Sequence, residues 1–134
     1  MLIEAWAGCL TDADDEEEDN AARGRHALIM RRFRRILVEQ PDRALYIPEL
    51  CEAIEVSERT FRICCSEQIG MSPKRYLTLR RMHLVRRALL IATLSAGSVT
   101  EIATRYGFWE FGRFAAVYRS IFDELPSETL RRAH

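Results

Sequence analysis

Two stretches of the chain, LCEAIEVSERTFRICCSEQIGMSPKRYL (residues 50–77) and IATRYGFWEFGRFAAVYRSIFDELPSETL (residues 102–130), follow one template. Each predicts a short helix, then a turn, then a longer helix with an aromatic residue near its start, Phe61 or Phe114. Each then breaks and restarts a helix at a proline, and the second copy is one residue longer between turn and aromatic. Two short helices joined by a tight turn are typical of a helix-turn-helix, so the sequence predicts two such units.

The turn inside each copy needs a residue that tolerates the left-handed backbone conformation. Gly107 occupies that place in the second copy and Glu55 in the first, where it is expected to cost up to about 1 kcal/mol relative to glycine. The longer helix ends at Gly70 in the first copy and at Asp123 in the second. Asp adopts this conformation less easily than Gly but more easily than most residues, so both departures predict tolerable local strain.

The longer helix of the first copy is predicted to have one buried face. Ser57 is a good N-cap for it, because the serine hydroxyl satisfies a backbone N–H that the first turn leaves unpaired. Phe61, Cys64 and Cys65 share one face at the i, i+3, i+4 spacing. These three side chains are therefore expected to fasten the helix to its own subdomain.

The other face of this helix suits the edges of base pairs. A helix-turn-helix places the N-terminal half of its second helix in the major groove of DNA. Arg59 and Arg62 would bind guanine O6 and N7, a contact of roughly 1 to 3 kcal/mol of discrimination each. Glu58 would accept from cytosine N4, or only orient Arg62 through an i, i+4 pair. A single such helix would favour ordinary surface charges, whereas two copies and a spacer favour DNA.

The longer helix of the second copy offers fewer side chains for base contacts. Its predicted buried stripe is Phe114, Val117, Tyr118 and Ile121. Gly112 and Ala116 on the opposite side allow close approach or contact with a thymine methyl, while Arg113 suits a phosphate as well as a base. Trp109 is more typical of a staple for the helix start than of a base contact. The first copy is therefore expected to supply more of the direct readout.

Two sets of residues are predicted at the DNA. Those expected along the recognition helices are Ser57, Glu58, Arg59, Thr60, Arg62, Trp109, Glu110, Gly112 and Arg113. Those expected to contact phosphates are Lys74, Arg75 and Arg119.

Residues 73–94 between the copies form one uninterrupted helical pattern, with Ser72 at the cap and Pro73 at the first helical position. About 18 helical residues would span ~27 Å. Successive major grooves on one face of DNA lie ~34 Å apart, so one rod and a modest bend in the DNA would place two reading helices in neighbouring grooves.

The net charge of zero hides an asymmetry. The first 20 residues hold eight acids and no Lys or Arg, so the remaining chain holds 20 basic residues against 12 acids. The acidic run over residues 12–19 is expected to be a solvated, flexible linker. From Arg25 the pattern turns helical, with an apolar stripe that ends before Pro41 and consists of Leu28, Ile29, Phe33, Ile36 and Leu37. The predicted domains are an acidic tail over residues 1–24 and a DNA-binding domain over 25–134.

Several classes of protein are disfavoured by the sequence. Cys9, Cys51, Cys64 and Cys65 show no spacing typical of a metal site, and the adjacent pair suits reduced core cysteines. The sequence shows no phosphate-binding glycine loop and no catalytic set of Ser, His, Asp or Cys residues, so an enzyme, a metal and a cofactor are not expected. No stretch approaches 18 uninterrupted apolar residues, so no membrane partner is expected. No secretory signal precedes the acidic run, so a cytoplasmic location is expected.

The two copies and their spacer also resemble a known family. VTEIATRYGFWEFGRFAAVYRSIFDELPSETLRR (residues 99–132) looks like the second helix-turn-helix signature of the AraC/XylS family of bacterial transcription regulators. VSERTFRICCSEQIGMSPKRYLTLRRMHLVRRAL (residues 56–89) resembles the first unit and linker helix of that family. The resemblance implies an all-α domain of about seven helices that contacts adjacent major grooves. It also implies promoter binding and activation through RNA polymerase. Glu55 and Asp123 depart from the family, which usually has glycine at both places.

The resemblance raises a question about the N-terminus. Members of the family usually carry an N-terminal effector-binding or dimerisation domain of well over a hundred residues, and only some 24 residues precede the match. The chain is then expected to be either a fragment of a longer regulator or a small stand-alone one. LIEAWAGCL (residues 2–10) before the acidic run suggests the tail of a lost domain. Two reading units in one chain remove the need for a dimer, so the DNA-binding domain is expected to be monomeric.

A rival from another class is an arginine-rich helical module that binds an acidic protein without specific DNA readout. In a related interpretation, the acidic run over residues 12–19 folds back on the basic face and competes with DNA.

Overall fold

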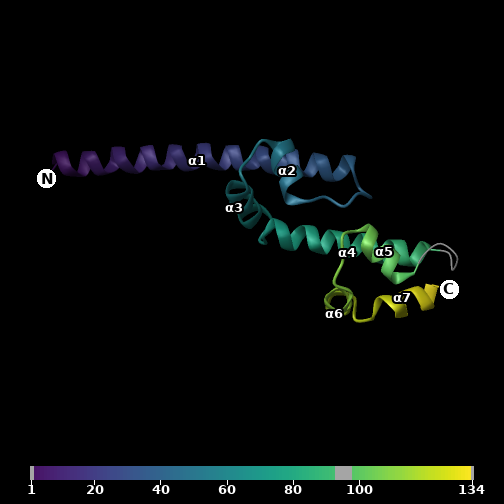
Figure 1. The fold of residues 1–134 in the computed structure, drawn as a ribbon. Helices are drawn as coiled ribbons and strands as arrows, with labels where there is room; N and C mark the ends of the chain where they lie inside the picture. The colour runs from purple at the N-terminus through teal and green to yellow at the C-terminus, as the bar shows by residue number, and fades with distance from the viewer. Residues whose placement is uncertain (1, 93–97, 134) are drawn as a thin grey trace. The chain divides into compact units, whose positions relative to one another are not determined.

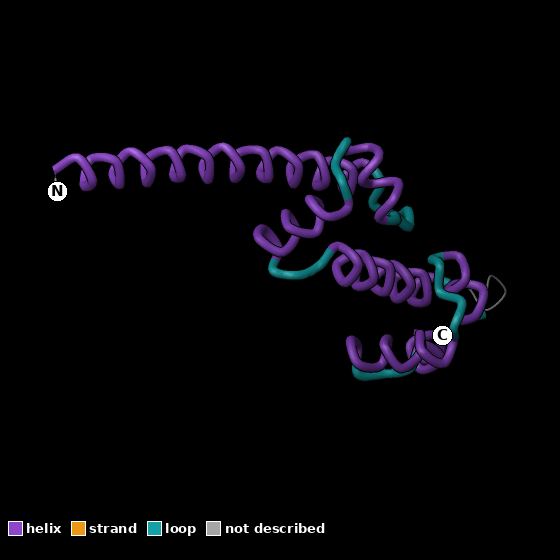
Figure 2. The backbone as a smooth tube through the Cα atoms, turned by 60° about the vertical axis from the view of Figure 1, so that its left-hand side comes forward, coloured by secondary structure: helices purple, strands orange, loops and turns teal. Residues whose placement is uncertain are grey.

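The computed structural model describes the backbone of residues 2–92 and 98–133, with side chains from residue 14 onward (Figure 1). These residues form seven helices, and Figure 2 draws the described stretches between them as loops and turns. The helices are α1 (Leu2–Glu39), α2 (Ile47–Ile54), α3 (Glu58–Ile69), α4 (Pro73–Ile91), α5 (Val99–Arg105), α6 (Phe111–Phe122) and α7 (Pro126–Ala133). The predicted all-α class, the two helix-turn-helix units and the linker helix between them are confirmed.

The chain divides into two compact units. The first consists of the chain up to Glu39 together with Ile47–Pro73, and the second of Gln40–Tyr46 together with the chain from Lys74. Each unit therefore contains one predicted helix-turn-helix, α2–α3 in the first and α5–α6 in the second. The linker helix α4 belongs to the second unit and ends at Ile91, while residues 93 and 94 of the prediction lie outside the described residues.

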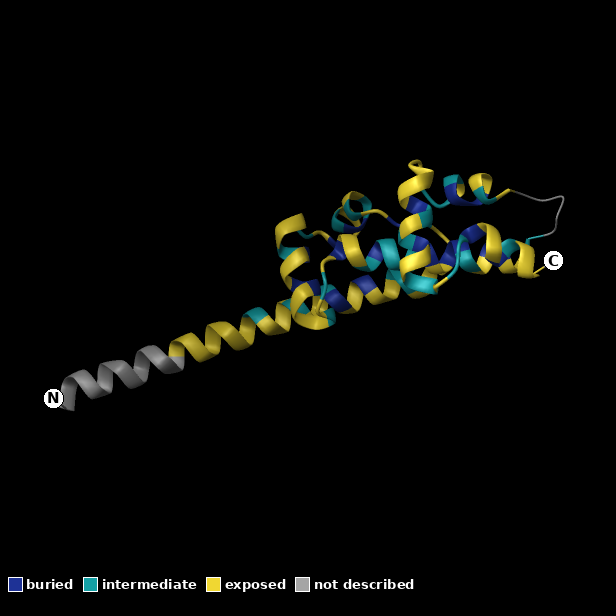
Figure 3. Ribbon diagram, turned by 90° about the horizontal axis from the view of Figure 1, so that it is seen from below, coloured by how far each residue is buried: buried dark blue, intermediate teal, exposed yellow. Residues whose placement is uncertain are grey.

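The acidic run is helical, which corrects the expectation of a flexible linker. Helix α1 runs without a break from Leu2 to Glu39, so it passes through both the acidic run and the expected boundary after residue 24. Residues 14–21 are all exposed, as Figure 3 shows along the protruding part of α1. No proline interrupts this stretch, and once the packed C-terminal part of α1 has formed, each further residue adds to a helix that has already nucleated. The sequence prediction overlooked this propagation.

The core of the first unit joins all three of its helices. Phe33 of α1 packs edge-on against Phe61 of α3, with ring centroids 5.0 Å apart. The fully or almost fully buried side chains are Met30, Phe33, Leu50, Ile54, Phe61, Cys64 and Cys65. The predicted face of α3 is thus confirmed, but the stripe on α1 is partly wrong. Leu28 is 43% exposed and Met30 takes its place, because Leu28 stands five residues before Phe33, on nearly the opposite side of the helix.

The second unit packs α5, α6 and α7 on α4. Its buried cluster contains Met82, Val85, Ala88, Leu89, Ile102, Ala103, Phe114 and Tyr118. Val117 and Ile121, which the sequence placed in the buried stripe of α6, are partly buried against this cluster. The Tyr118 hydroxyl lies 2.7 Å from the Thr129 hydroxyl, which donates to a Glu124 carboxylate oxygen at 2.7 Å. The polar contacts tie α6 to α7 inside an otherwise apolar core.

A set of hydrogen bonds from Arg80 joins the loop after α1 to the second unit. Arg80 of α4 donates to the backbone carbonyls of Gln40, Pro41 and Arg43 at 2.6, 3.2 and 2.5 Å. Burial lowers the pKa of the Arg80 guanidinium, and the carbonyl oxygens replace the water that it loses. These hydrogen bonds help to attach Gln40–Tyr46 to the second unit rather than to α1.

Within residues 2–92 and 98–133, the four residues in the left-handed conformation occur at the predicted places. Glu55 (φ 63°) and Gly107 (φ 86°) follow the first helix of each unit, and Asp123 (φ 58°) and Gly70 (φ 80°) follow the second. The two turns have the same hydrogen bonds. In the first turn, the N–H of residue 56 donates to the carbonyl of residue 51, and the N–H of residue 55 donates to the carbonyl of residue 52. In the second turn, the N–H of residue 108 donates to the carbonyl of residue 103, and the N–H of residue 107 donates to the carbonyl of residue 104. Both patterns form a Schellman motif, so the sequence repeat is also a repeat of backbone geometry.

The two turn residues differ in what surrounds them, which generates a prediction. Glu55 is exposed, whereas a Cβ on Gly107 would fall on the Tyr46 hydroxyl and within 2.9 Å of Arg81 Nη1. We expect Glu55→Gly to raise the free energy of unfolding by about 1 kcal/mol, because glycine adopts positive φ without strain. Gly107→Ala should lower it by about 3 kcal/mol through backbone strain and overpacking. Urea unfolding of both variants checks this, and Tyr46→Phe in the Gly107→Ala background should restore part of the loss.

The buried thiol of Cys65 predicts a loss of stability at alkaline pH. Burial raises the pKa of Cys65 from 9.0 to about 12. A thiol that stays protonated in the folded chain but ionises in the unfolded one stabilises the fold below pH 9, and this contribution disappears as the pH rises toward 12. We expect the free energy of unfolding to fall by up to about 1.4 kcal/mol per pH unit above pH 9 from this group. Urea unfolding at pH 8 to 11 measures this dependence, and Cys65→Ala should reduce the fall in the free energy of unfolding with pH. Leu50→Ala, which also creates a cavity in this core but removes no titratable group, should lower the free energy of unfolding by the same amount at every pH.

Candidate nucleic-acid interface

The first helix-turn-helix presents the N-terminal half of α3 to solvent. Ser57 caps the helix as predicted, since its hydroxyl accepts the Thr60 N–H at 3.1 Å. The same hydroxyl donates to the Thr60 side chain at 2.9 Å. Ser57, Glu58, Arg59 and Arg62 are exposed and Thr60 is half-buried. The structure therefore brings all five predicted residues of this unit together around the start of one helix.

The charges on α3 lie side by side and remain accessible. Arg62 Nη2 lies 3.6 Å from Glu58 Oε1, with 62% and 59% of the two side chains exposed. This is the i, i+4 pair that the sequence suggested, and at such exposure it is weak enough for a competing anion to open. Arg59 is exposed beside them. Two guanidinium groups and one carboxylate on one helix face match the donors and acceptors of base edges.

The second helix-turn-helix has a different surface. Ser98 caps α5 by accepting the Glu101 N–H at 3.2 Å, whereas Glu110 at the start of α6 makes no capping bond with its side chain. Trp109 is 72% exposed, and Arg113 and Glu110 form a loose pair with 3.9 Å between Nη1 and Oε2. Gly112 is exposed and has open space where a side chain would stand. The four predicted residues thus surround the start of α6.

A groove joins the start of α6 to α4. It encloses about 410 Å³. Lys74 lines it together with Trp109, Glu110 and Arg113, and Phe108 and Arg81 line it as well. Of the predicted phosphate contacts, Lys74 is therefore placed beside the second recognition helix, although it follows the first in sequence. Arg75 and Arg119 are exposed and do not line this groove.

Arg81 holds the second turn in place, a role that the sequence did not predict. Its guanidinium lies 4.7 Å from the centre of the Phe108 ring and 5.3 Å from that of Tyr46. It donates to the carbonyls of Tyr106 and Gly107 at 3.3 and 3.5 Å, while its buried Nε has no hydrogen-bond partner among the described residues. A cation between two rings and against two turn carbonyls fixes the loop that leads into α6.

The two recognition helices can be compared residue by residue from Phe61 and Phe114. Counted from these buried rings, Arg59 corresponds to Gly112, Thr60 to Arg113 and Ile63 to Ala116. The second helix thus has no arginine at the place of Arg59. Arg113 stands one place later, at the position that corresponds to Thr60. Ile63, which sequence reasoning left out of the candidate site, is 42% exposed on the first helix. The sequence could have indicated this residue, because helical spacing places an apolar side chain at position 63 outside the buried stripe of Phe61, Cys64 and Cys65.

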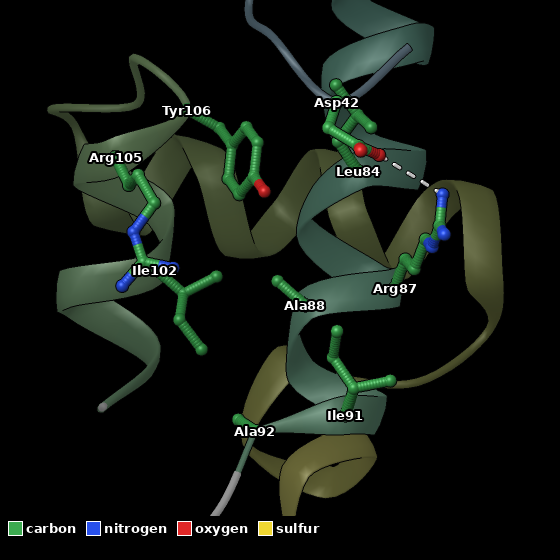
Figure 4. Close-up of a pocket in the computed structure, with 9 residues that line it drawn as sticks. All are labelled: Asp42, Leu84, Arg87, Ala88, Ile91, Ala92, Ile102, Arg105 and Tyr106. Carbon is green, nitrogen blue, oxygen red and sulfur yellow. Dashed lines mark hydrogen bonds and ion pairs between the residues drawn. The ribbon is translucent and has the colours of Figure 1, made fainter. Parts of the chain in front are cut away.

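A second hollow in the second unit is of another kind. Figure 4 shows it between α4 and α5, with Ala88 of α4 pointing toward Ile102 of α5. Arg87 and Asp42 form an ion pair of 3.2 Å at its rim. The hollow encloses about 340 Å³ and includes none of the residues predicted at the DNA.

The structure opposes the interpretation of the acidic run as an internal competitor. Phe33 contacts Phe61, and His26 Nδ1 lies 2.7 Å from Glu67 Oε2, so α1 and α3 run in opposite directions. Arg59 lies toward the C-terminal part of α1, whereas residue 19 lies a further ~10 Å beyond His26 at the other end. The acids would reach Arg59 only if α1 broke.

Comparison with known proteins agrees with this geometry. A family model described as a helix-turn-helix domain matches residues 50–132. The XylDLEGF operon transcriptional activator 1 of Pseudomonas putida is 39% identical over 94 residues, which cover 70% of this chain and 28% of that protein. The HTH-type transcriptional activator RhaS of Yersinia pestis is 30% identical over 128 residues, which cover 96% of this chain and 42% of that protein. The chain therefore spans less than half the length of either relative.

A solved structure is similar over almost its whole length. The crystal structure of a probable AraC family transcriptional regulator from Rhodopseudomonas palustris superimposes with a TM-score of 0.67 at 30% sequence identity. The match covers 79% of this chain and 97% of that one.

Proposed function

Because the chain belongs to the AraC/XylS family of transcription regulators, we propose that it binds promoter DNA sequence-specifically and activates transcription there. The observation that carries this proposal is the shared geometry of the two helix-turn-helix units. In each, a left-handed residue and a Schellman motif lead into a helix that buries an aromatic residue and leaves its start exposed. In a DNA-binding helix-turn-helix, that start enters the major groove.

The length of α4 supports binding in two neighbouring grooves. Its 19 residues correspond to ~28 Å of helix. Neighbouring major grooves on one face of DNA are ~34 Å apart, so a modest bend of the duplex closes the difference. In this proposal, one chain occupies both half-elements as a monomer.

The two recognition helices would divide the work. Arg59 and Arg62 of α3 supply bidentate donors for guanine, and Glu58 supplies an acceptor for cytosine. In the second unit, Lys74 and Arg113 line one groove with the exposed Trp109, an arrangement suited to holding the DNA backbone. Arg75 and Arg119 add positive charge for further phosphates. The first unit is proposed to determine most of the sequence preference and the second to add affinity.

The relatives suggest the consequence of binding. The similar proteins of P. putida and Y. pestis are named transcriptional activators, so we propose that this chain also favours recruitment of RNA polymerase at its promoters. A bacterial regulator of this kind would meet its promoters in the cytoplasm, where the chromosome lies.

The proposed readout makes a prediction about the two arginines of α3. We expect Arg59→Ala with Arg62→Ala to weaken binding to a selected DNA site at least about tenfold and to relax base preference, because bidentate contacts with guanine are lost. A gel-shift titration against the selected and a scrambled duplex measures both effects. The matched control replaces Arg31 and Arg34, two exposed arginines of α1 with the same spacing, and should leave the base preference intact. Unchanged affinity and preference in the α3 variant would refute the proposed readout.

The use of two reading helices makes a prediction about the DNA site. Selection of binding sites from a random duplex library should return a bipartite motif with half-elements about ten base pairs apart. Affinity for it should fall steeply with added salt, because phosphate contacts release counterions. A single uninterrupted element, or no enriched motif, would contradict the use of two reading helices.

A further inference from the structure

One apolar side chain on the recognition face of α3 is only partly covered by the fold. Phe61, Cys64 and Cys65 are completely buried, whereas Ile63 is 42% exposed. The structure describes α3 throughout, and Ile63 is its only exposed apolar residue. Part of the apolar surface of Ile63 therefore stays in contact with water, where the fold gains nothing from it.

The neighbours of Ile63 are the residues proposed to read bases. Ile63 stands four residues after Arg59, so the two side chains are adjacent on the helix surface. It directly follows Arg62 and is the sixth residue of α3, within the N-terminal half of the helix. An apolar group is therefore placed among hydrogen-bonding groups, on the part of the helix that enters a major groove.

The major groove contains a chemical partner for such a group. Base edges there present hydrogen-bond donors and acceptors, and the 5-methyl of thymine is the apolar group among them. We propose that Ile63 is a specificity-determining residue that contacts the methyl group of a thymine next to the guanine read by Arg59. The inference rests on the proposed function and names a base that the arginines alone would not select.

The second unit provides an internal comparison. The residues of α6 that correspond to Arg59 and Ile63 are Gly112 and Ala116. Gly112 has no guanidinium to take the place of Arg59, so a guanine and a thymine read by neighbouring side chains in this way are expected in the half-element that α3 reads. This asymmetry identifies which half-element to test.

The experiment replaces thymine by uracil, which removes only the methyl group. Gel-shift titrations with the full chain would use the selected duplex, with each thymine of the α3 half-element replaced in turn. One replacement should weaken binding about fourfold, as expected for one methyl group returned to water. Ile63→Ala should weaken binding to the thymine duplex by about four- to tenfold and make binding insensitive to that uracil.

Two controls separate this contact from a general effect. Leu28→Ala removes an apolar side chain of the same unit that is 43% exposed, on α1 instead of α3, and should keep both the affinity and the uracil effect. Arg59→Ala should weaken binding but keep the uracil effect, because the methyl contact is made by another side chain. Circular dichroism should show Ile63→Ala to be folded, since the side chain is exposed and alanine favours helices.

The outcomes distinguish this inference from the proposed function. If the chain selects a bipartite site that depends on Arg59 and Arg62 but tolerates uracil everywhere in the α3 half-element, the proposed function stands and the role of Ile63 is refuted. The same holds if Ile63→Ala retains the uracil effect, or if no thymine is selected there. If no site is selected at all, the proposed function itself fails.

Discussion

Each recognition helix depends on one residue in the left-handed conformation. Glu55 and Gly107 reverse the chain after a short helix, and the same pair of backbone hydrogen bonds closes both turns. Because the turn sets the direction in which α3 and α6 leave, it also sets which of their faces is buried and which is exposed. The buried rings of Phe61 and Phe114 then hold that orientation. The exposed starts of the helices, and hence any reading of DNA, follow from this geometry.

The two units meet this constraint with different means. The first tolerates a glutamate in the turn, because that residue is exposed and only its backbone is strained. The second requires glycine, because Tyr46 and Arg81 pack directly on the turn. Arg81 also stacks on Phe108 and donates to two turn carbonyls, so the second turn is braced by α4 and by the loop after α1. A similar sequence template therefore leads to a permissive turn in one unit and a tightly packed one in the other.

The surfaces of the units differ as much as their turns. The start of α3 carries arginines, an acid and an exposed isoleucine at consecutive positions of one face. The corresponding places on α6 hold glycine and alanine, beside an exposed tryptophan and a groove that Lys74 and Arg113 line. These differences support a division between direct readout in the first unit and backbone contact in the second.

Local sequence alone determined the helices, their caps and their turns. Ser57 as a cap, the four left-handed positions and the buried face of α3 depend on interactions within a few residues, and spacing along the chain predicts these. Tertiary structure decided the rest. The attachment of Gln40–Tyr46 by Arg80 and the grouping of Lys74 with Trp109 depend on which segments pack together. Contacts between residues far apart in the chain leave no periodic pattern in the sequence.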